Sequence, residues 1–279
     1  MTNNTVQQML IDFNKEFTKI VLPDDAVTVV RPQAGLLKSL RENDVPIIKV
    51  CPPQANADMF FDVLKDVAGI VVKHKPDLER DINKILSALP AAAEARELFV
   101  MQAFTPGTNL LESFNEELSP ESLGFILNHV VKPFMKQYAR KVSTFFAPEQ
   151  WLKGTCPVCG GKPTLALLEK EEGKRYLYCG MCEARWRFQR LGCPYCSSNE
   201  SRFFNVEGME QYRVYYCDNC HGYIKTLNEA MMFDSSNLDL FWEDINTVHL
   251  DLLALQEGYV NQPVEITEIA HFHVKGGQV

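Results

Sequence analysis

Four Cys-x-x-Cys pairs lie within one segment of the chain and contain eight of its nine cysteines. Nineteen residues separate the first two pairs, and twenty separate the last two. A Cys-x-x-Cys turn places two sulfurs at the spacing of two ligands of one ion, and a second turn completes a tetrahedron of thiolates around zinc or iron. This spacing predicts two four-cysteine metal sites. The candidate ligands are Cys156, Cys159, Cys179, Cys182, Cys193, Cys196, Cys217 and Cys220.

The two halves of this segment repeat one another. The cysteines of the first half recur 37 or 38 positions later, and each half opens with Cys-Pro-x-Cys. Each half also contains three short runs of strand-forming residues, at 165–168, 175–178 and 185–188, then at 203–206, 212–216 and 222–225. The pattern predicts a tandem duplication of one small zinc-ribbon-like hairpin unit. It leaves open whether each ion is held within one unit or between the two.

Two other uses of the cysteines are weaker interpretations. Disulfides need an oxidising compartment, and the polar residues 1–10 lack the basic and apolar regions of a secretory leader. Redox dithiols of the thioredoxin type use one Cys-x-x-Cys rather than four in register. The ninth cysteine, Cys51, lies far from the cluster in sequence and is expected to be a small core residue.

Composition excludes several function classes. The formal net charge of the 279 residues is −8, which argues against nonspecific nucleic-acid binding, and no apolar run reaches the length of a membrane span. Phosphate-binding loops, nucleophile elbows and His-Glu-x-x-His motifs are absent from the sequence.

The histidines offer few further ligand candidates. The pair His271 and His273 is expected to be incidental, and His221 is a candidate for a hydrogen bond near the metal site.

Basic residues concentrate between positions 174 and 190, where five of them accompany a single acid. Positions 226–274, by contrast, contain nine acids and no lysine or arginine. The basic group either offsets the negative charge of a metal–thiolate centre or forms a docking surface for an acidic or phosphate-bearing partner. The candidate docking residues are Arg175, Arg185, Arg187 and Arg190.

The sequence before residue 150 has helical periodicity. Helices are expected at about 6–21, 56–73, 76–89 and 90–104, with Asn56 as the cap of the second. Ser119-Pro120-Glu121 is a helix start signal for a segment reaching about 146. A further long helix is expected at 238–259, followed by an irregular tail. The prediction is an α+β chain with a helical domain at 1–150, metal-binding modules at 151–192 and 193–234, and a C-terminal helix and tail at 235–279.

Several longer motifs resemble one known family, the formate dehydrogenase accessory proteins called FdhE. The resemblance is specific from about Trp151 to Tyr259 and loose before that. The runs that carry it are Trp151-x2-Gly154-x-Cys156-Pro157-x-Cys159-Gly160-x2-Pro163, Arg175-Tyr176-Leu177-x-Cys179-x2-Cys182-x3-Trp186-x3-Arg190-x2-Cys193-Pro194-x-Cys196, Cys217-Asp218-x-Cys220-x2-Tyr223-Ile224-Lys225-Thr226 and Leu250-Asp251-Leu252-Leu253-Ala254-x2-Glu257-Gly258-Tyr259.

This resemblance implies a cytoplasmic maturation factor that is not an enzyme. It would bind the molybdenum- or tungsten-containing catalytic subunit of a respiratory formate dehydrogenase before twin-arginine export. It also implies rubredoxin-like modules with two metal ions, each in a four-cysteine site, where iron is favoured and zinc is the alternative.

Two other functions stay open. An iron redox protein that transfers electrons to a client or protects it is the second hypothesis, and a zinc-ribbon nucleic-acid-binding protein is the third. Homodimer formation is left open.

Overall fold

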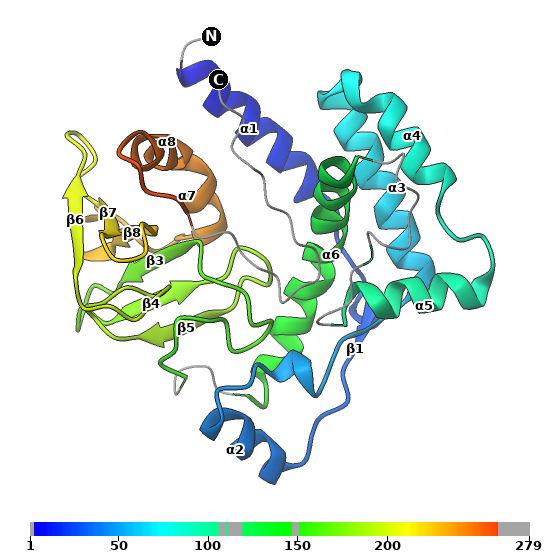
Figure 1. Cartoon of the computed structure of the whole chain (residues 1–279), viewed down its shortest axis with the longest axis horizontal. Helices are drawn as coiled ribbons and strands as arrows, with labels where there is room; N and C mark the ends of the chain where they lie inside the picture. The colour runs from blue at the N-terminus through cyan, green and yellow to red at the C-terminus, as the bar shows by residue number, and fades with distance from the viewer. Residues whose placement is uncertain (1–2, 106–109, 111–118, 147–150, 262–279) are drawn as a thin grey trace.

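The computed structural model describes residues 3–105, 110, 119–146 and 151–261. Figure 1 shows a helical part on one side and a twisted sheet on the other, with the long helix α6 between them. Two short helices near the C-terminus cover the sheet beside α1. This mixed arrangement confirms the predicted α+β class, while the domain limits at residues 150, 192 and 234 stay predictions.

The helical part is held together by α3 and α6, which pack against each other. Two start signals predicted from the sequence are confirmed. The Asn56 side chain accepts a hydrogen bond from the Met59 amide at 3.0 Å, and the Ser119 hydroxyl accepts one from the Ser122 amide at 3.2 Å. The helices are α1 (Asn3–Phe17), α2 (Ala34–Glu42), α3 (Ala57–His74), α4 (Glu79–Ser87), α5 (Ala93–Ala103) and α6 (Pro120–Ser143).

Parts of this region differ from the purely helical prediction. The strands β1 (Val27–Thr28) and β2 (Gln54–Ala55) form a small antiparallel pair, and α2 lies between them in the sequence. The helix expected at 76–89 is divided into a 3₁₀ turn at Pro76–Leu78 and α4. The strands β1 and β2 and the 3₁₀ turn are only two or three residues long. Such short segments bury too few side chains to show a clear hydrophobic periodicity, so the sequence pattern does not predict them.

A single six-stranded sheet contains both cysteine-rich units. Its strand order is β5-β4-β3-β8-β7-β6, and all neighbours are antiparallel except β3 and β8. The first strand of the first unit, β3, therefore pairs with the last strand of the second unit, β8. The two three-stranded units consequently lie side by side in the same orientation within the sheet. The strands are β3 (Leu165–Leu168), β4 (Arg175–Tyr178), β5 (Arg185–Phe188), β6 (Ser201–Asn205), β7 (Tyr212–Cys217) and β8 (Tyr223–Asn228).

The prediction of a single C-terminal helix at 238–259 is wrong. Two helices occupy this stretch, α7 (Leu240–Asn246) and α8 (Val248–Gln256), with Thr247 between them in a non-helical conformation. The Thr247 hydroxyl donates to the Glu243 carbonyl at 2.7 Å, a local bond that competes with the helical ladder. The predicted irregular tail falls mainly on residues 262–279, outside the described residues.

A buried lysine attaches α7 and α8 to the sheet. Lys225 on β8 is 1% exposed, and its ammonium contacts the carboxylates of Asp244 and Asp251 at 2.8 Å each. Burial opposes the charge of Lys225, but the two carboxylates outweigh it and raise the pKa of the ammonium. Asp251 also accepts a hydrogen bond from the Tyr223 hydroxyl at 2.9 Å. The acidic C-terminal stretch thus meets the sheet through an internal ion-pair network.

We expect Lys225→Met to destabilise the protein by roughly 3 kcal/mol, because it leaves two shielded carboxylates without their cation. Urea unfolding followed by circular dichroism measures this loss. Lys65→Met on α3 is the matched control, since that lysine is exposed and forms a surface ion pair with Asp62; its effect should stay within about 0.5 kcal/mol. Equal stabilities of the two variants would show that the network does not hold the C-terminal helices.

Candidate metal centres

The eight cysteines gather into two groups, each drawn from one unit. Cys156, Cys159, Cys179 and Cys182 form the first site, and Cys193, Cys196, Cys217 and Cys220 form the second. Within each group the sulfurs all lie within 4.8 Å of one another. The geometry thus favours ligation within each unit over the crossed arrangement that the sequence left open.

The sulfur spacing fits tetrahedral coordination. Sulfurs on opposite turns are 3.5 Å apart in the first site and 3.6 Å apart in the second. A tetrahedron with metal–sulfur bonds of about 2.3 Å has edges of about 3.8 Å. A disulfide needs a sulfur separation of about 2.05 Å, and none of the nine cysteines is in one. An all-thiolate donor set suits zinc or iron and does not suit magnesium or calcium.

One backbone turn builds all four Cys-x-x-Cys pairs. In each, the amide of the first cysteine donates to the carbonyl five residues on, and the amide four residues on donates back to the first cysteine. The residue at that fourth position has a positive φ in every turn: 81° at Gly160, 58° at Glu183, 62° at Ser197 and 55° at His221. His221 therefore occupies the same position that Gly160, Glu183 and Ser197 occupy in the other three turns. The backbone conformation of the turn accounts for its place beside Cys220.

The first site belongs to the main hydrophobic core. All four of its cysteines are buried, and they pack in one cluster with residues of the helical part. The backbone amides of Ile47 and Ile48 donate to the carbonyls of Pro157 and Val158, at 3.0 and 3.1 Å. The segment before β2 thus completes the first metal-binding turn. No sequence pattern predicts this support, because a backbone donor does not depend on the type of side chain.

Hydrogen bonding among the buried thiols distinguishes the cysteines of the first site. Hydrogen bonds with the neighbouring thiols lower the pKa of Cys179, so its thiolate is the favoured charged form. The contact with Cys156 raises the pKa of Cys159, and burial raises the pKa of Cys182. Metal binding requires all four thiolates, so an ion must replace these shared protons.

The second site lies closer to solvent. Cys193 and Cys217 are buried, whereas Cys196 and Cys220 are partly exposed. The Asn219 amide donates to the Cys196 sulfur from 3.4 Å. Burial works against ionisation of Cys196, but hydrogen bonds from Asn219, the Ser198 backbone and neighbouring thiols lower its pKa to about 7. Cys196 is therefore an accessible sulfur that readily forms a thiolate, a combination that favours reaction with thiol reagents.

Contacts between the units fix the second site relative to the first. The Tyr195 hydroxyl lies 3.1 Å from the carbonyls of both Pro163 and Tyr223. A Cβ added at Gly154 would lie 1.8 Å from the Pro194 carbonyl oxygen, so only glycine permits this approach of the two chains. Both sites are consequently part of one packed body.

Arg175 does not belong to a docking surface, contrary to the sequence-based expectation. Its side chain is 1% exposed and lies 5.1 Å from the Tyr215 ring and 5.8 Å from the Phe188 ring. The guanidinium donates to the Gly192 carbonyl at 2.9 Å. Arg175 thus crosses from β4 to the link between the two metal sites and contacts that link through this hydrogen bond.

The other three arginines are exposed. Arg185 and Arg187 point away from the core on β5, a strand at the edge of the sheet, and Arg185 stacks 5.1 Å from the Tyr176 ring. Arg190 bonds to the Gly173 carbonyl and, with Arg187 and Lys174, lines a hollow of about 390 Å³. These side chains form a basic surface along one edge of the sheet.

The histidine pair of the sequence analysis, His271 and His273, lies outside the described residues.

Comparisons with known proteins agree with this geometry. Residues 155–190 match the model of the FdhE central domain. An FdhE homologue of Aquifex aeolicus is 33% identical over 160 residues, covering 54% of each chain. A homologue of Haemophilus ducreyi is 28% identical over 156 residues, covering 54% of this chain and 50% of its own. Over the matched residues, the chain is similar to FdhE proteins. It spans about half the length of these FdhE relatives in the matched alignments.

The likeness of fold extends further than the likeness of sequence. The crystal structure of the FdhE protein from Pseudomonas aeruginosa superposes with a TM-score of 0.56, covering 94% of this chain and 88% of that one. Sequence identity is 16%, so this match shows a shared FdhE fold alone. No helix in the described part of the chain is long and apolar enough to cross a bilayer.

The unequal exposure of the two sites predicts an order of metal release. When zinc-loaded protein is titrated with a mercurial thiol reagent, we expect about one equivalent of zinc to leave first, and the remainder roughly tenfold more slowly. A chromogenic zinc indicator follows the release. The second site should be the fast one because Cys196 and Cys220 reach solvent.

Two serine variants assign the phases. Cys196→Ser should abolish the fast phase and leave a folded protein, whereas Cys159→Ser should remove ligation inside the main core and cost several kcal/mol of stability. Circular dichroism and thermal unfolding report the fold. Simultaneous release of both ions, or a more damaging Cys196→Ser variant, would contradict the assignment.

Proposed function

We propose that this chain is a non-catalytic accessory factor for a respiratory formate dehydrogenase, acting in the cytoplasm on the catalytic subunit before export. The burial of the first site carries the proposal. A four-thiolate site leaves no coordination position for a substrate, and this one lies inside the core that joins helices and sheet. The similarity to FdhE proteins supports the client assignment, because the motifs of residues 151–259 resemble those of formate dehydrogenase accessory proteins.

In this proposal the metal ions maintain the shape of a protein-binding body. The sheet and its two sites create a rigid edge at β5, and the exposed Arg185, Arg187 and Arg190 give that edge positive charge. The net charge of the chain is −8, so this basic surface stands out against an acidic background. Such a surface steers an acidic partner face into one orientation. The proposed client contact is therefore the β5 edge.

We expect Arg187→Glu to reduce recovery of the catalytic subunit in a pull-down by about tenfold, because charge reversal replaces attraction with repulsion at the contact. Arg80→Glu on α4 is the matched control, since Arg80 is exposed and belongs to the helical part. It should leave recovery unchanged. Both variants must retain the metal content and unfolding temperature of the parent protein. Equal recovery with both would remove the β5 edge from the proposal.

A second candidate function is electron transfer to the client through the second site. The partial exposure of Cys196 and Cys220 favours it, because an exposed thiolate iron centre can approach a redox partner. We expect iron-loaded protein to show thiolate-to-iron absorption that dithionite bleaches and air restores. Formate dehydrogenase assembly supported by protein containing only zinc would exclude this role and leave the accessory function intact.

A further inference from the structure

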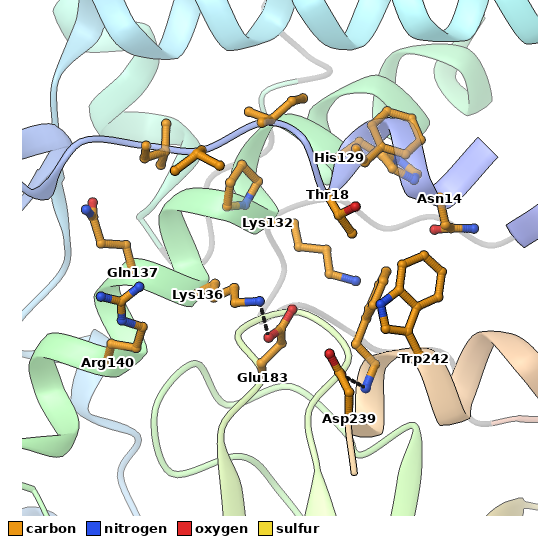
Figure 2. Close-up of a pocket in the computed structure, with 16 residues that line it drawn as sticks. Asn14, Thr18, His129, Lys132, Lys136, Gln137, Arg140, Glu183, Asp239 and Trp242 are labelled. Carbon is orange, nitrogen blue, oxygen red and sulfur yellow. Dashed lines mark hydrogen bonds and ion pairs between the residues drawn. The ribbon is translucent and has the colours of Figure 1, made fainter. Parts of the chain in front are cut away.

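A cavity of about 340 Å³ lies where three distant parts of the chain meet. Its walls come from α1 and the segment after it, from α6, and from the start of α7, and the turn after Cys182 contributes Glu183. Figure 2 shows Arg140 and Gln137 toward one end and Lys132 and Trp242 toward the other, with Lys136 and Glu183 between them. The cavity is separate from the basic surface at β5.

Three cations line the cavity from one face of α6. Lys132, Lys136 and Arg140 are spaced four residues apart, which places them in a row along the helix. Lys136 pairs with Glu183 at 2.6 Å. The Lys132 ammonium lies 4.4 Å from the centre of the Phe241 ring. Within the described residues, no hydrogen bond or ion pair reaches the Lys132 ammonium or the Arg140 guanidinium.

The nearby acids do not fully neutralise this row. Glu183 is paired with Lys136, and the Asp239 carboxylate accepts a hydrogen bond from the Phe241 amide at the start of α7. Burial lowers the pKa of Lys132, which shows how little solvent stabilises its charge. Burial also lowers the pKa of His129 to about 4, so that ring is neutral near pH 7. Within the described residues, neither Lys132 nor Arg140 therefore has a direct ion-pair partner, although the more distant carboxylates of Glu183 and Asp244 favour the charged form of Lys132.

A glutamine on the cavity wall has an amide oxygen without a donor. Gln137 is 5% exposed, and its Nε2 donates to the Pro23 carbonyl at 2.7 Å, which fixes the orientation of the side chain. Its Oε1 is buried and has no hydrogen-bond partner among the described residues. A buried acceptor without a donor costs about 1–3 kcal/mol, so this part of the wall is less stable than a fully hydrogen-bonded one.

The remaining walls are apolar. Phe17 and Ile20 line the cavity from the α1 side, and Trp242 lines it from α7. Lys132 and Arg140 are eight residues apart on α6, which corresponds to about 12 Å along the helix axis. About four residues of extended chain cover the same distance, and side chains four positions apart in such a chain point in the same direction.

We propose that this cavity binds an extended acidic peptide, with two carboxylates against Lys132 and Arg140 and apolar side chains against Phe17 and Trp242. A single small anion satisfies one cation and offers no apolar group to the aromatic walls, so it fits the lining less well. The proposal goes beyond the accessory function above. It concerns the chemistry of the bound segment and does not depend on which client the protein serves.

The probe is a blocked octapeptide with two glutamates four positions apart and valine or threonine elsewhere. Binding to the full-length metal-loaded protein is followed by tryptophan emission and by anisotropy of a labelled copy. We expect the glutamate peptide to bind at least about tenfold more tightly than its glutamine counterpart, and more weakly as salt is raised. Trp242→Phe should remove most of the emission change and retain the anisotropy signal.

Lys132→Met and Arg140→Gln should each weaken the glutamate peptide by about tenfold and leave the glutamine peptide unaffected. Arg80→Gln is the control for general loss of charge. Thermal unfolding must show that the variants keep their fold, and Arg140→Gln keeps the test decisive if Lys132→Met unfolds. Absence of binding, equal affinity for the two peptides, or insensitivity to both cavity substitutions would overturn the proposal.

A competing occupant is available within the chain, because residues 262–279 contain Glu265 and Glu268. If peptide binding is seen only in a full-length variant carrying Glu265→Gln and Glu268→Gln, the cavity serves an internal segment and the proposal of an external peptide fails. Unchanged peptide affinity in that variant supports it. Neither result alters the Arg187→Glu pull-down, so failure here is distinguishable from failure of the accessory function.

Discussion

The fold depends on thiolate coordination at the place where helices and sheet meet. The four sulfurs of the first site are shielded from water, and bringing four deprotonated thiols together without an ion is electrostatically unfavourable. The backbone amides of Ile47 and Ile48 are directed at the turn that presents Cys156 and Cys159. Metal binding and docking of the helical part are therefore linked equilibria, and each stabilises the other.

The two sites are chemically similar and lie in different surroundings. Each uses the same backbone turns, but the first lies against the helices while the second is bordered by Asn219 and solvent. The parallel pairing of β3 with β8 places both sites at one end of a continuous sheet, because the strands that begin beside them all run the same way. The two sites have the same set of ligands and differ in their surroundings. The first site is shielded inside the core, whereas solvent can reach the second.

Sequence analysis succeeded where the information is local. The cysteine spacing, the six strand segments and the caps at Asn56 and Ser119 each depend on a few neighbouring residues, and the structure shows them as predicted. It failed where distant segments decide. Nothing near Arg175 indicates that Tyr215 and Phe188 will enclose it, and nothing near Thr247 indicates that Lys225 will hold the helices on both sides of it.

The same local turn that completes the first site also shapes the cavity on α6. Glu183 has a positive φ because it closes the Cys179–Cys182 turn, and that conformation directs its carboxylate to Lys136. A metal ion that orders this turn would therefore also fix the acid that pairs with Lys136 in the middle of the cationic row. Lys132 and Arg140 lie on either side of that pair. Glu183 thus connects the turn of the first site with the cavity proposed to bind an acidic peptide.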